Sequence, residues 1–91
     1  QEVEALLVTQ DSIAEAACVA MPDPVMGEKV CAFVIASAGS VPTLEAVRSH
    51  LAERGLARFK LPERLEVRDA LPRTASGKVQ KSPLREELLH G

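Results

Sequence analysis

Two apolar segments in the first third of the chain have the pattern of β-strands. Residues 13–21 and 29–37 are rich in Val, Ile and Ala at successive positions, which is typical of strands buried on both faces. Strands of this kind require helices on at least one side of their sheet. The segment 22–28 between them contains Pro, Asp and Gly, and its length predicts a connection longer than a tight hairpin turn.

Helical periodicity is found in three segments. Residues 2–8 have the i, i+3, i+4 spacing of a short amphipathic helix. A second helix is predicted to begin after Thr43, a good N-cap, and to end at Gly55. A third is predicted to begin with Ser82 as its cap and Pro83 at its first position. The apolar positions of these three patterns are Val3, Leu6 and Leu7; Leu44, Val47 and Leu51; and Leu84 and Leu88.

A strict alternation of apolar and charged residues predicts one further strand at residues 64–69. Leu65 and Val67 alternate with three charged side chains, which is typical of a half-buried strand at or near the edge of a sheet. The predicted order of elements is therefore α-β-β-α-β-α. This order predicts a small single α+β domain with a sheet of about three strands packed with helices.

Composition supports one small domain. The chain has 91 residues, 46% of them hydrophobic, which suffices for a core. It begins with Gln1, so we expect a fragment or a processed piece of a longer protein. No apolar stretch reaches 18 residues and no signal peptide is visible at this N-terminus, so we predict no membrane span and a cytoplasmic location.

The two cysteines, Cys18 and Cys31, lie in apolar runs. We expect both to be buried free thiols, which fits a cytosolic origin. The chain has no Cys-x-x-Cys motif, and its two histidines are isolated from each other and from the cysteines. A metal site is therefore not expected.

The net charge of −2 is unevenly distributed. Residues 58–85 hold eight basic and three acidic side chains, a net charge of +5, which favours an anionic partner. Solvated strand and loop faces would explain the same asymmetry, so both interpretations remain open at this point. Nucleic acid is not expected as the partner, because aromatic side chains for stacking are scarce and the overall pI is not high.

The segment LPRTASGKVQK, residues 71–81, places Lys78 beside a glycine in a Pro-flanked loop. It is not a phosphate loop of the GxxxxGK[ST] type, because Pro72 and Val79 occupy positions that require Gly and Ser or Thr. A nucleophilic lysine needs an apolar pocket to lower its pKa, and the polar neighbours do not provide one. We therefore expect a cationic Lys78 that stabilises charge on an anionic reacting centre.

Three segments, in the right order, resemble motifs of the C-terminal domain of the adenylate-forming enzymes. This superfamily includes acyl- and aryl-CoA synthetases, peptide-synthetase adenylation domains and luciferases. QEVE at 1–4 resembles the end of the motif that opens this domain, and VAMPDPVMGEKVCAFVIA at 19–36 resembles its strand–loop–strand with D-x-x-x-G-E. RFKLPERLEVRDALPRTASGKVQKSPLREEL at 58–88 resembles its final motif, with Lys-x-Pro, Leu-Pro-Arg-Thr and Gly-Lys. The resemblance covers essentially all 91 residues.

The resemblance implies that residues 1–91 form a mobile lid. In this superfamily a large N-terminal domain binds ATP, Mg²⁺ and a carboxylic acid, and the lid closes over them. The lysine that matches Lys78 contacts the substrate carboxylate and the 5′ oxygen of the nucleotide while the acyl-adenylate forms. The lid then turns, and coenzyme A displaces AMP. Because the ATP and acid pocket belongs to the large domain, we expect the 91-residue chain to be inactive on its own.

The resemblance also ranks further site residues. Gly77 would let the loop backbone approach the substrate, although a plain turn glycine explains it too. Ser76 is a weaker candidate, and a local hydrogen bond that sets the shape of the loop is the simpler role for it. Lys81 and Arg85 are candidates for the phosphates of coenzyme A or the rim of the large domain, with a solvated basic face as the alternative.

Three functions remain open after the sequence. The run SGKVQK, with PLREEL one residue after it, resembles stand-alone acyl- or aryl-CoA ligases of fatty acid or aryl acid metabolism. The lid of a peptide-synthetase adenylation domain is the alternative within the superfamily. A different class is a non-catalytic module that binds an anionic partner through its basic C-terminal third. The residues of this chain do not name the acid.

Overall fold

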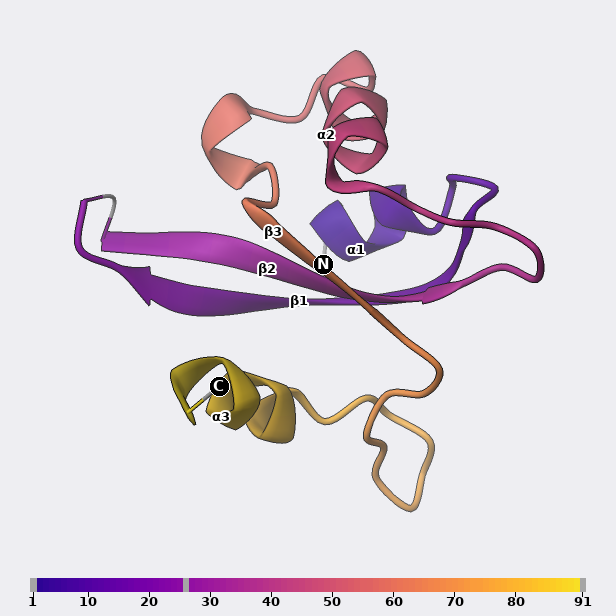
Figure 1. The fold of residues 1–91 in the computed structure, drawn as a ribbon, viewed down its shortest axis with the longest axis vertical. Helices are drawn as coiled ribbons and strands as arrows, with labels where there is room; N and C mark the ends of the chain where they lie inside the picture. The colour runs from indigo at the N-terminus through magenta and orange to yellow at the C-terminus, as the bar shows by residue number, and fades with distance from the viewer. Residues whose placement is uncertain (1, 26, 91) are drawn as a thin grey trace.

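One mixed sheet organises the domain (Figure 1). The structure is a computed structural model and describes residues 2–25 and 27–90. Strand β1 (Ile13–Asp23) runs antiparallel to the central strand β2 (Gly27–Ala36), and β3 (Arg64–Arg68) runs parallel to β2. The predicted three-stranded sheet is therefore confirmed for the described part of the chain.

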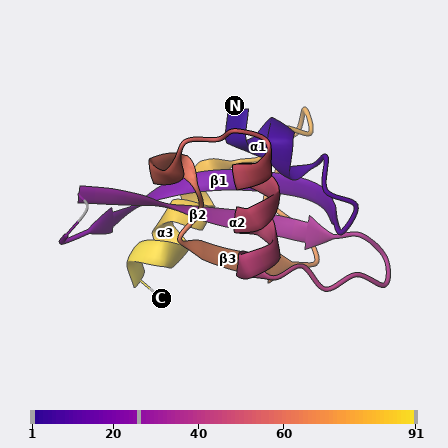
Figure 2. The same ribbon diagram turned by 90° about the horizontal axis from the view of Figure 1, so that it is seen from above.

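Helices cover both faces of this sheet. Helices α1 (Glu2–Leu7) and α2 (Leu44–Glu53) lie on one face, and α3 (Lys81–His90) lies on the other, as the two views show (Figures 1 and 2). A short 3-10 turn, η1 (Arg58–Lys60), precedes β3. The predicted α+β fold with the order α-β-β-α-β-α is confirmed.

The central strand β2 separates two hydrophobic cores because successive side chains of a strand point to opposite faces. Ala32 and Val34 face α1 and α2, whereas Cys31 and Phe33 face α3, and all four are fully buried. We call the first the α2 core; its buried members are Leu7, Ile13, Ala32, Val34, Val47, Leu51, Leu56 and Leu61. We call the second the α3 core; its buried members are Ala17, Val19, Cys31, Phe33, Leu71 and Leu84.

The connection between β1 and β2 is shorter than the sequence predicts. Pairing continues through Pro22 with Glu28 and Asp23 with Gly27, so the two strands form a hairpin and the predicted long connection is wrong. Proline is tolerated here because β1 is an edge strand, where one side of the backbone has no neighbour to bond. Residues typical of turns thus lie inside the ladder.

The helix ends confirm one predicted cap and correct another. The Thr43 hydroxyl accepts a hydrogen bond from the backbone N–H of Ala46 at 3.2 Å, and Gly55 follows α2 with a φ of +83°, as predicted. Helix α3, however, begins at Lys81, so Ser82 lies in its first turn and is not the residue that precedes it. Pro83 fits this first turn because its missing N–H would have no partner there.

Strand β3 is the second edge of the sheet, as its alternation predicts. Leu65 packs against the α2 core, whereas Val67 on the same face remains 47% exposed. On the opposite face the guanidinium of Arg68 lies over the ring of Phe33, 5.2 Å from its centroid. One charged face of β3 therefore covers part of the α3 core.

Both cysteines are free, as predicted; Cys31 is fully buried as expected, whereas Cys18 is only half-buried. Burial raises the pKa of Cys18 to about 12 and that of Cys31 to about 11. Both thiols therefore stay protonated and unreactive at neutral pH. Among the described residues, no helix has the length and apolar character needed to cross a membrane.

Candidate functional site

The predicted loop 71–81 is a small hairpin anchored on the α3 core. Leu71 is buried in this core and Val79 packs against it from the other arm. The arms are joined by an antiparallel bridge between Arg73 and Val79 and by a 2.8 Å hydrogen bond from the N–H of Gln80 to the carbonyl of Pro72. The tip of the hairpin extends away from the body of the domain (Figure 1).

The tip is a three-residue loop closed by Thr74 and Lys78. The N–H of Thr74 donates to the carbonyl of Lys78 at 2.8 Å, and the N–H of Gly77 donates to the carbonyl of Thr74 at 2.9 Å. Gly77 has a φ of +92°, the left-handed conformation that such loops require at their last position. A Cβ at Gly77 would meet no atom within 4 Å, so the need for glycine comes from the backbone angle. Its close approach to a substrate stays a prediction.

Side-chain hydroxyls complete the loop. The hydroxyls of Thr74 and Ser76 are 2.9 Å apart, and the Thr74 hydroxyl also accepts from the N–H of Lys78 at 3.2 Å. These bonds give Ser76 the local role that the sequence predicts for it. Contact of Ser76 with a substrate stays a prediction.

Lys78 extends from this hairpin into solvent. Val79 faces the α3 core, and because successive side chains of an extended arm alternate, Lys78 faces away from it. The Lys78 side chain is exposed and forms no ion pair with any residue in the described part of the chain. Its ammonium is therefore available to an anion supplied from outside this chain.

Lys81 has a partner inside the domain, in contrast to Lys78. Its Nζ lies 2.7 Å from Oε2 of Glu4, and the same oxygen accepts the N–H of Cys18 at 2.7 Å. Burial acts to raise the pKa of Glu4, but the hydrogen bonds from Lys81 and Cys18 outweigh it and leave that pKa lowered. The structure thus gives Lys81 a structural contact, and its predicted contact with coenzyme A phosphates stays untested.

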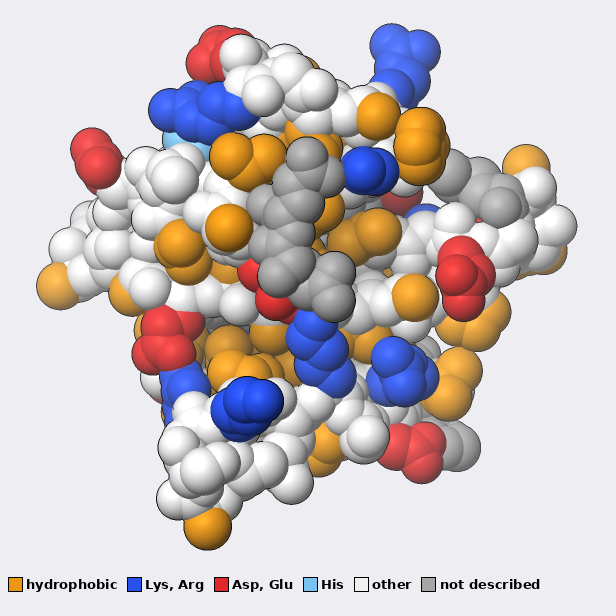
Figure 3. Space-filling view, turned by 180° about the vertical axis from the view of Figure 1, so that it is seen from behind, with side chains coloured by type: hydrophobic (Ala, Val, Ile, Leu, Met, Phe, Trp, Pro, Cys, Tyr) orange, Lys and Arg blue, Asp and Glu red, His pale blue; other side chains and the backbone are white. Residues whose placement is uncertain are grey.

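Arg85, the remaining candidate, is exposed on α3. With Lys81 it borders a pocket of about 390 Å³, whose other lining residues are Val3, Cys18, Val19, Ala20 and Val30. Figure 3 shows Lys and Arg side chains beside exposed hydrophobic ones on the lower half of the face seen from behind. Such a surface suits contact with another protein domain as well as with a phosphate.

Much of the basic C-terminal third is neutralised within the domain. Among the described residues, its cations with carboxylate partners include Arg64 with Glu66, Arg68 with Glu66 and Glu87, Arg73 with Glu15, and Lys81 with Glu4. Hydrogen bonds from Arg68 and Arg64 lower the pKa of Glu66. The net charge of this third therefore overstates its attraction for an anionic partner. Lys78 differs from Arg73 and Lys81, which lie near it in the sequence and have carboxylate partners.

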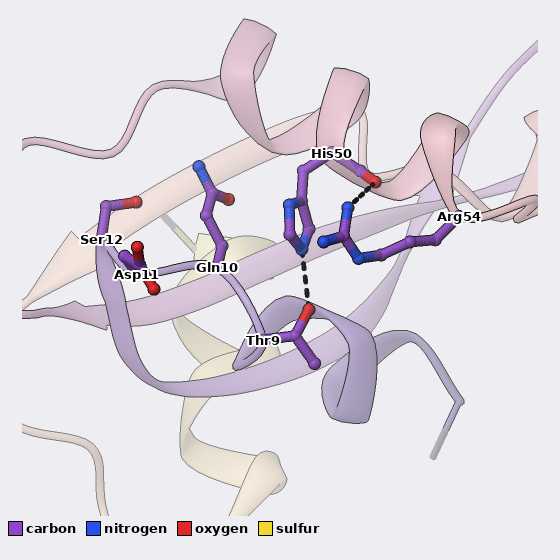
Figure 4. Close-up of a pocket in the computed structure, with 6 residues that line it drawn as sticks. All are labelled: Thr9, Gln10, Asp11, Ser12, His50 and Arg54. Carbon is purple, nitrogen blue, oxygen red and sulfur yellow. Dashed lines mark hydrogen bonds between the residues drawn. The ribbon is translucent and has the colours of Figure 1, made fainter.

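A second, polar pocket of about 460 Å³ lies between the α1–β1 connection and α2 (Figure 4). His50 Nε2 lies 2.8 Å from the Thr9 hydroxyl, and Arg54 donates to the carbonyl of His50 at 3.3 Å. Oε1 of Gln10 and Oγ of Ser12 are buried without a hydrogen-bond partner in the described part of the chain. The pocket mixes donors and acceptors, and the Thr9–His50 contact links the segment after α1 to α2. No group of metal-ligating residues occurs among the described ones.

Sequence reasoning gave no role to Phe59. Its ring is 75% exposed on η1, and it lines a surface pocket of about 510 Å³ with Arg48, Arg58 and Glu63. The sequence does indicate that Phe59 is exposed: it is one of two aromatic residues in the chain, and both of its neighbours are cations. A core aromatic residue rarely has such neighbours.

Comparison with known families decides what kind of domain carries this hairpin. Residues 2–78 match the family described as the AMP-binding enzyme C-terminal domain. The chain belongs to this family. The resemblance found in its three sequence motifs is thereby confirmed: the chain is an AMP-binding enzyme C-terminal domain.

Individual relatives agree with this assignment. Pseudomonine synthase PmsE of Pseudomonas entomophila is 46% identical over 85 residues, 93% of this chain and 14% of that protein. The salicylyl-CoA synthase / salicylate adenylyltransferase of a Streptomyces species is 45% identical over 86 residues, 94% of this chain and 16% of that protein. The crystal structure of Brucella canis acyl-CoA synthetase has a TM-score of 0.91 at 34% identity, over 98% of this chain and 17% of that one. The chain thus spans about a sixth of the length of such relatives.

Proposed function

We propose that this domain is the lid of an AMP-forming ligase for carboxylic acids and that Lys78 acts in the formation of the acyl-adenylate. The observation that carries the proposal is the placement of Lys78. It is an exposed cation that forms no ion pair with any described residue, on a hairpin whose backbone is fixed by hydrogen bonds, in the Gly-Lys pair that resembles the family's final motif. A large N-terminal domain, outside this chain, would hold ATP, Mg²⁺ and the acid.

The reaction explains why a fixed cation is needed. An oxygen of the substrate carboxylate attacks the α-phosphorus of ATP, a new C–O–P linkage forms, and the bond from the α-phosphorus to the pyrophosphate oxygen breaks. Two anions must approach each other, and negative charge develops on the transferred group. The Lys78 ammonium would offset this charge without rearranging, because its hairpin is already ordered. Lys78 need neither lose nor gain a proton.

The second half-reaction transfers the acyl group to a thiol. The thiolate attacks the acyl carbon, a thioester forms, and AMP leaves with its phosphate. We propose that coenzyme A is the thiol and that the acid is aromatic, on the basis of the Streptomyces relative named for salicylyl-CoA and salicylate. A carrier-protein thiol is the second candidate, because the peptide-synthetase adenylation domains belong to the same superfamily.

Lys78→Ala in the full-length enzyme tests the proposal. We expect acyl-adenylate formation, measured as ATP–pyrophosphate exchange with a panel of aryl acids, to slow by about 10²–10³-fold, the usual loss for one preorganised charge-stabilising group. Thioester formation from a preformed acyl-adenylate should keep its rate, because the lid has turned by then. Lys78→Arg keeps the charge but not the compact ammonium, so it should recover the rate in part.

Equal slowing of both half-reactions by Lys78→Ala would mean that the lysine is a general binding or structural residue. The same assay identifies the acceptor. Supplying coenzyme A to the wild-type enzyme should release AMP and an aryl-CoA, and AMP release only with a phosphopantetheinylated carrier protein would select the second candidate.

A further inference from the structure

The peptide group that leads into Lys78 is held at both of its polar ends. The carbonyl of Gly77 accepts a hydrogen bond from Nη1 of Arg73 at 3.0 Å. The N–H of Lys78, in the same peptide group, donates to the Thr74 hydroxyl at 3.2 Å. Because a peptide group is planar, fixing its oxygen and its N–H fixes its orientation, and this sets the direction in which the Lys78 side chain leaves the backbone.

Arg73 is itself held by a residue that is distant in the sequence. Its second terminal nitrogen, Nη2, forms an ion pair with the Glu15 carboxylate of β1. A guanidinium presents several N–H donors in a rigid plane, so one side chain can serve a carboxylate and a carbonyl at the same time. Glu15, Arg73 and the Gly77 carbonyl therefore form a continuous chain of contacts from the sheet to the tip of the hairpin.

A β-bulge directs Glu15 toward the hairpin. Ile13 pairs with Ala36 and Glu15 pairs with Ile35, so the register shifts by one residue between them. In a regular strand, residues two positions apart share a face. Here Ile13 enters the α2 core, whereas Glu15 lies on the face of Ala17 and the α3 core, where the hairpin is anchored. The bulge in β1 thus places Glu15 on the face where it can pair with Arg73.

We propose that Arg73, held by Glu15, is a positioning residue that fixes the Gly77–Lys78 peptide group and thereby the approach of Lys78 to the reacting atoms. This inference rests on the function proposed above for Lys78. The side chains of Arg73 and Glu15 are 36% and 46% exposed, and an ion pair with that exposure adds little to stability. Its effect on the geometry of a reacting group is far larger, since a misplacement of about 1 Å can slow a reaction about 10²-fold.

The test uses Arg73→Ala and Glu15→Gln in the full-length enzyme. We expect Arg73→Ala to lower kcat for acyl-adenylate formation by about 10–100-fold, with little change in the KM for ATP or acid, because the ammonium remains but is badly placed. Glu15→Gln should give a smaller loss in the same direction. Arg73→Lys keeps the contact with Glu15 but loses the second donor of the fork, so its recovery should be partial. Thioester formation from preformed acyl-adenylate should be unchanged.

Arg48→Ala is the matched control. Nη1 of Arg48 also serves a carbonyl and a carboxylate, those of Pro62 at 2.7 Å and Glu63 at 2.9 Å, but these contacts lie away from the hairpin. Its substitution removes the same chemistry and should leave acyl-adenylate formation unchanged. A loss equal to that of Arg73→Ala would overturn the inference.

A double variant distinguishes this inference from the function on which it rests. Because Arg73 acts through Lys78, adding Arg73→Ala to Lys78→Ala should cause no further slowing of adenylation. Further slowing by the same factor, or equal slowing of both half-reactions by Arg73→Ala, would overturn the positioning role while leaving Lys78 in place. Normal adenylation by Lys78→Ala alone would instead refute the proposed function. If Arg73→Ala does not fold, the test rests on Glu15→Gln. An unchanged kcat for acyl-adenylate formation in Glu15→Gln would then overturn the inference.

Discussion

The smallest feature on which the site depends is the backbone angle of one residue. Gly77 has a φ of +92°, and it is the residue directly before Lys78. An L side chain in this region of φ costs about 1–2 kcal/mol, because its Cβ approaches the neighbouring carbonyl oxygen. The hairpin could avoid that cost only by changing its turn, and Lys78 would move with it.

Gly77→Ala in the full-length enzyme should therefore slow acyl-adenylate formation at least 10-fold, in line with the sensitivity of rates to small misplacements. Gly39→Ala is the control: Gly39 has a φ of +77°, and a Cβ there also meets no atom within 4 Å. Both substitutions introduce the same backbone strain, but only the first is next to Lys78. Exchange assays on the two variants compare them, and similar rates would argue against a dependence on the turn.

At the scale of elements, one carboxylate connects three of them. Glu4 of α1 accepts the N–H of Cys18, on edge strand β1, and the ammonium of Lys81, at the start of α3. Helices α1 and α3 lie on opposite faces of the sheet (Figure 1), so this contact joins the two helical layers past the edge of β1. A hydrogen bond to a charged group contributes about 1.5–3 kcal/mol to stability, against about 0.5–1.5 kcal/mol for a neutral pair.

Glu4→Gln should lower the free energy of unfolding of the 91-residue chain by about 1–2 kcal/mol at pH 7, measured by urea denaturation. The pKa of Glu4 is lowered in the folded state, so its stabilisation is present above the unfolded pKa, near 4.5, and is lost as pH falls through the folded value. The difference between wild type and variant should therefore shrink below pH 4.5. Glu53→Gln, an exposed substitution on α2, should change little. A constant difference down to pH 3 would contradict this account.

The elements and the two ends of α2 were predictable from the sequence, whereas the start of α3, the extent of the β1–β2 pairing and the cross-contacts were not. Apolar periodicity predicts each helix and strand, since it reflects the face that is buried. Pro22 and Gly27 have the local preferences of a turn, and only pairing across the sheet keeps them in strands. The orientation of Glu15 also depends on pairing across the sheet. It is set by a β-bulge, and a bulge exists only where two strands pair.

The candidate site shows the same division. The Gly-Lys motif makes Lys78 a candidate from the sequence alone, because the motif is local to a short loop; its role in the reaction stays a prediction. The partners of Arg73 and Lys81 lie 58 and 77 positions away in the sequence, on β1 and α1, and no local pattern indicates them. From the sequence alone, Lys81 is therefore a candidate phosphate ligand, whereas the structure pairs its ammonium with Glu4.

For the whole molecule, the main feature is that the two cores share one sheet. Val34 of β2 belongs to the α2 core and Val19 of β1 belongs to the α3 core, yet these strands are hydrogen-bonded neighbours. Losing either helical layer would expose one whole face of the sheet to water. The domain should therefore unfold as a unit, even though no core spans both faces.

Val34→Ala and Val19→Ala test this on the isolated 91-residue chain. Each removes two methyl groups from a fully buried position, and each should lower the free energy of unfolding by about 2 kcal/mol. In both variants, helical circular dichroism and the methyl NMR signals of both cores should disappear in one urea transition. The chain has no Trp or Tyr, so these probes replace fluorescence. Early loss of α3 alone in Val19→Ala would show that the two layers unfold separately.

The folded isolated chain should nevertheless catalyse no ATP–pyrophosphate exchange with any aryl acid. In the proposed role, Lys78 would offset charge only where a nucleotide and a carboxylate are held against it, and its side chain is exposed on the hairpin. A single cation in water binds an anion weakly, because the high dielectric constant reduces their attraction at 4 Å to about 1 kcal/mol. Folding without activity would thus separate the two contributions of the sequence: the sheet and its two cores order the hairpin, and the large domain must supply the anions. Measurable exchange by the purified chain would refute the assignment of the acid and ATP pocket to the large domain.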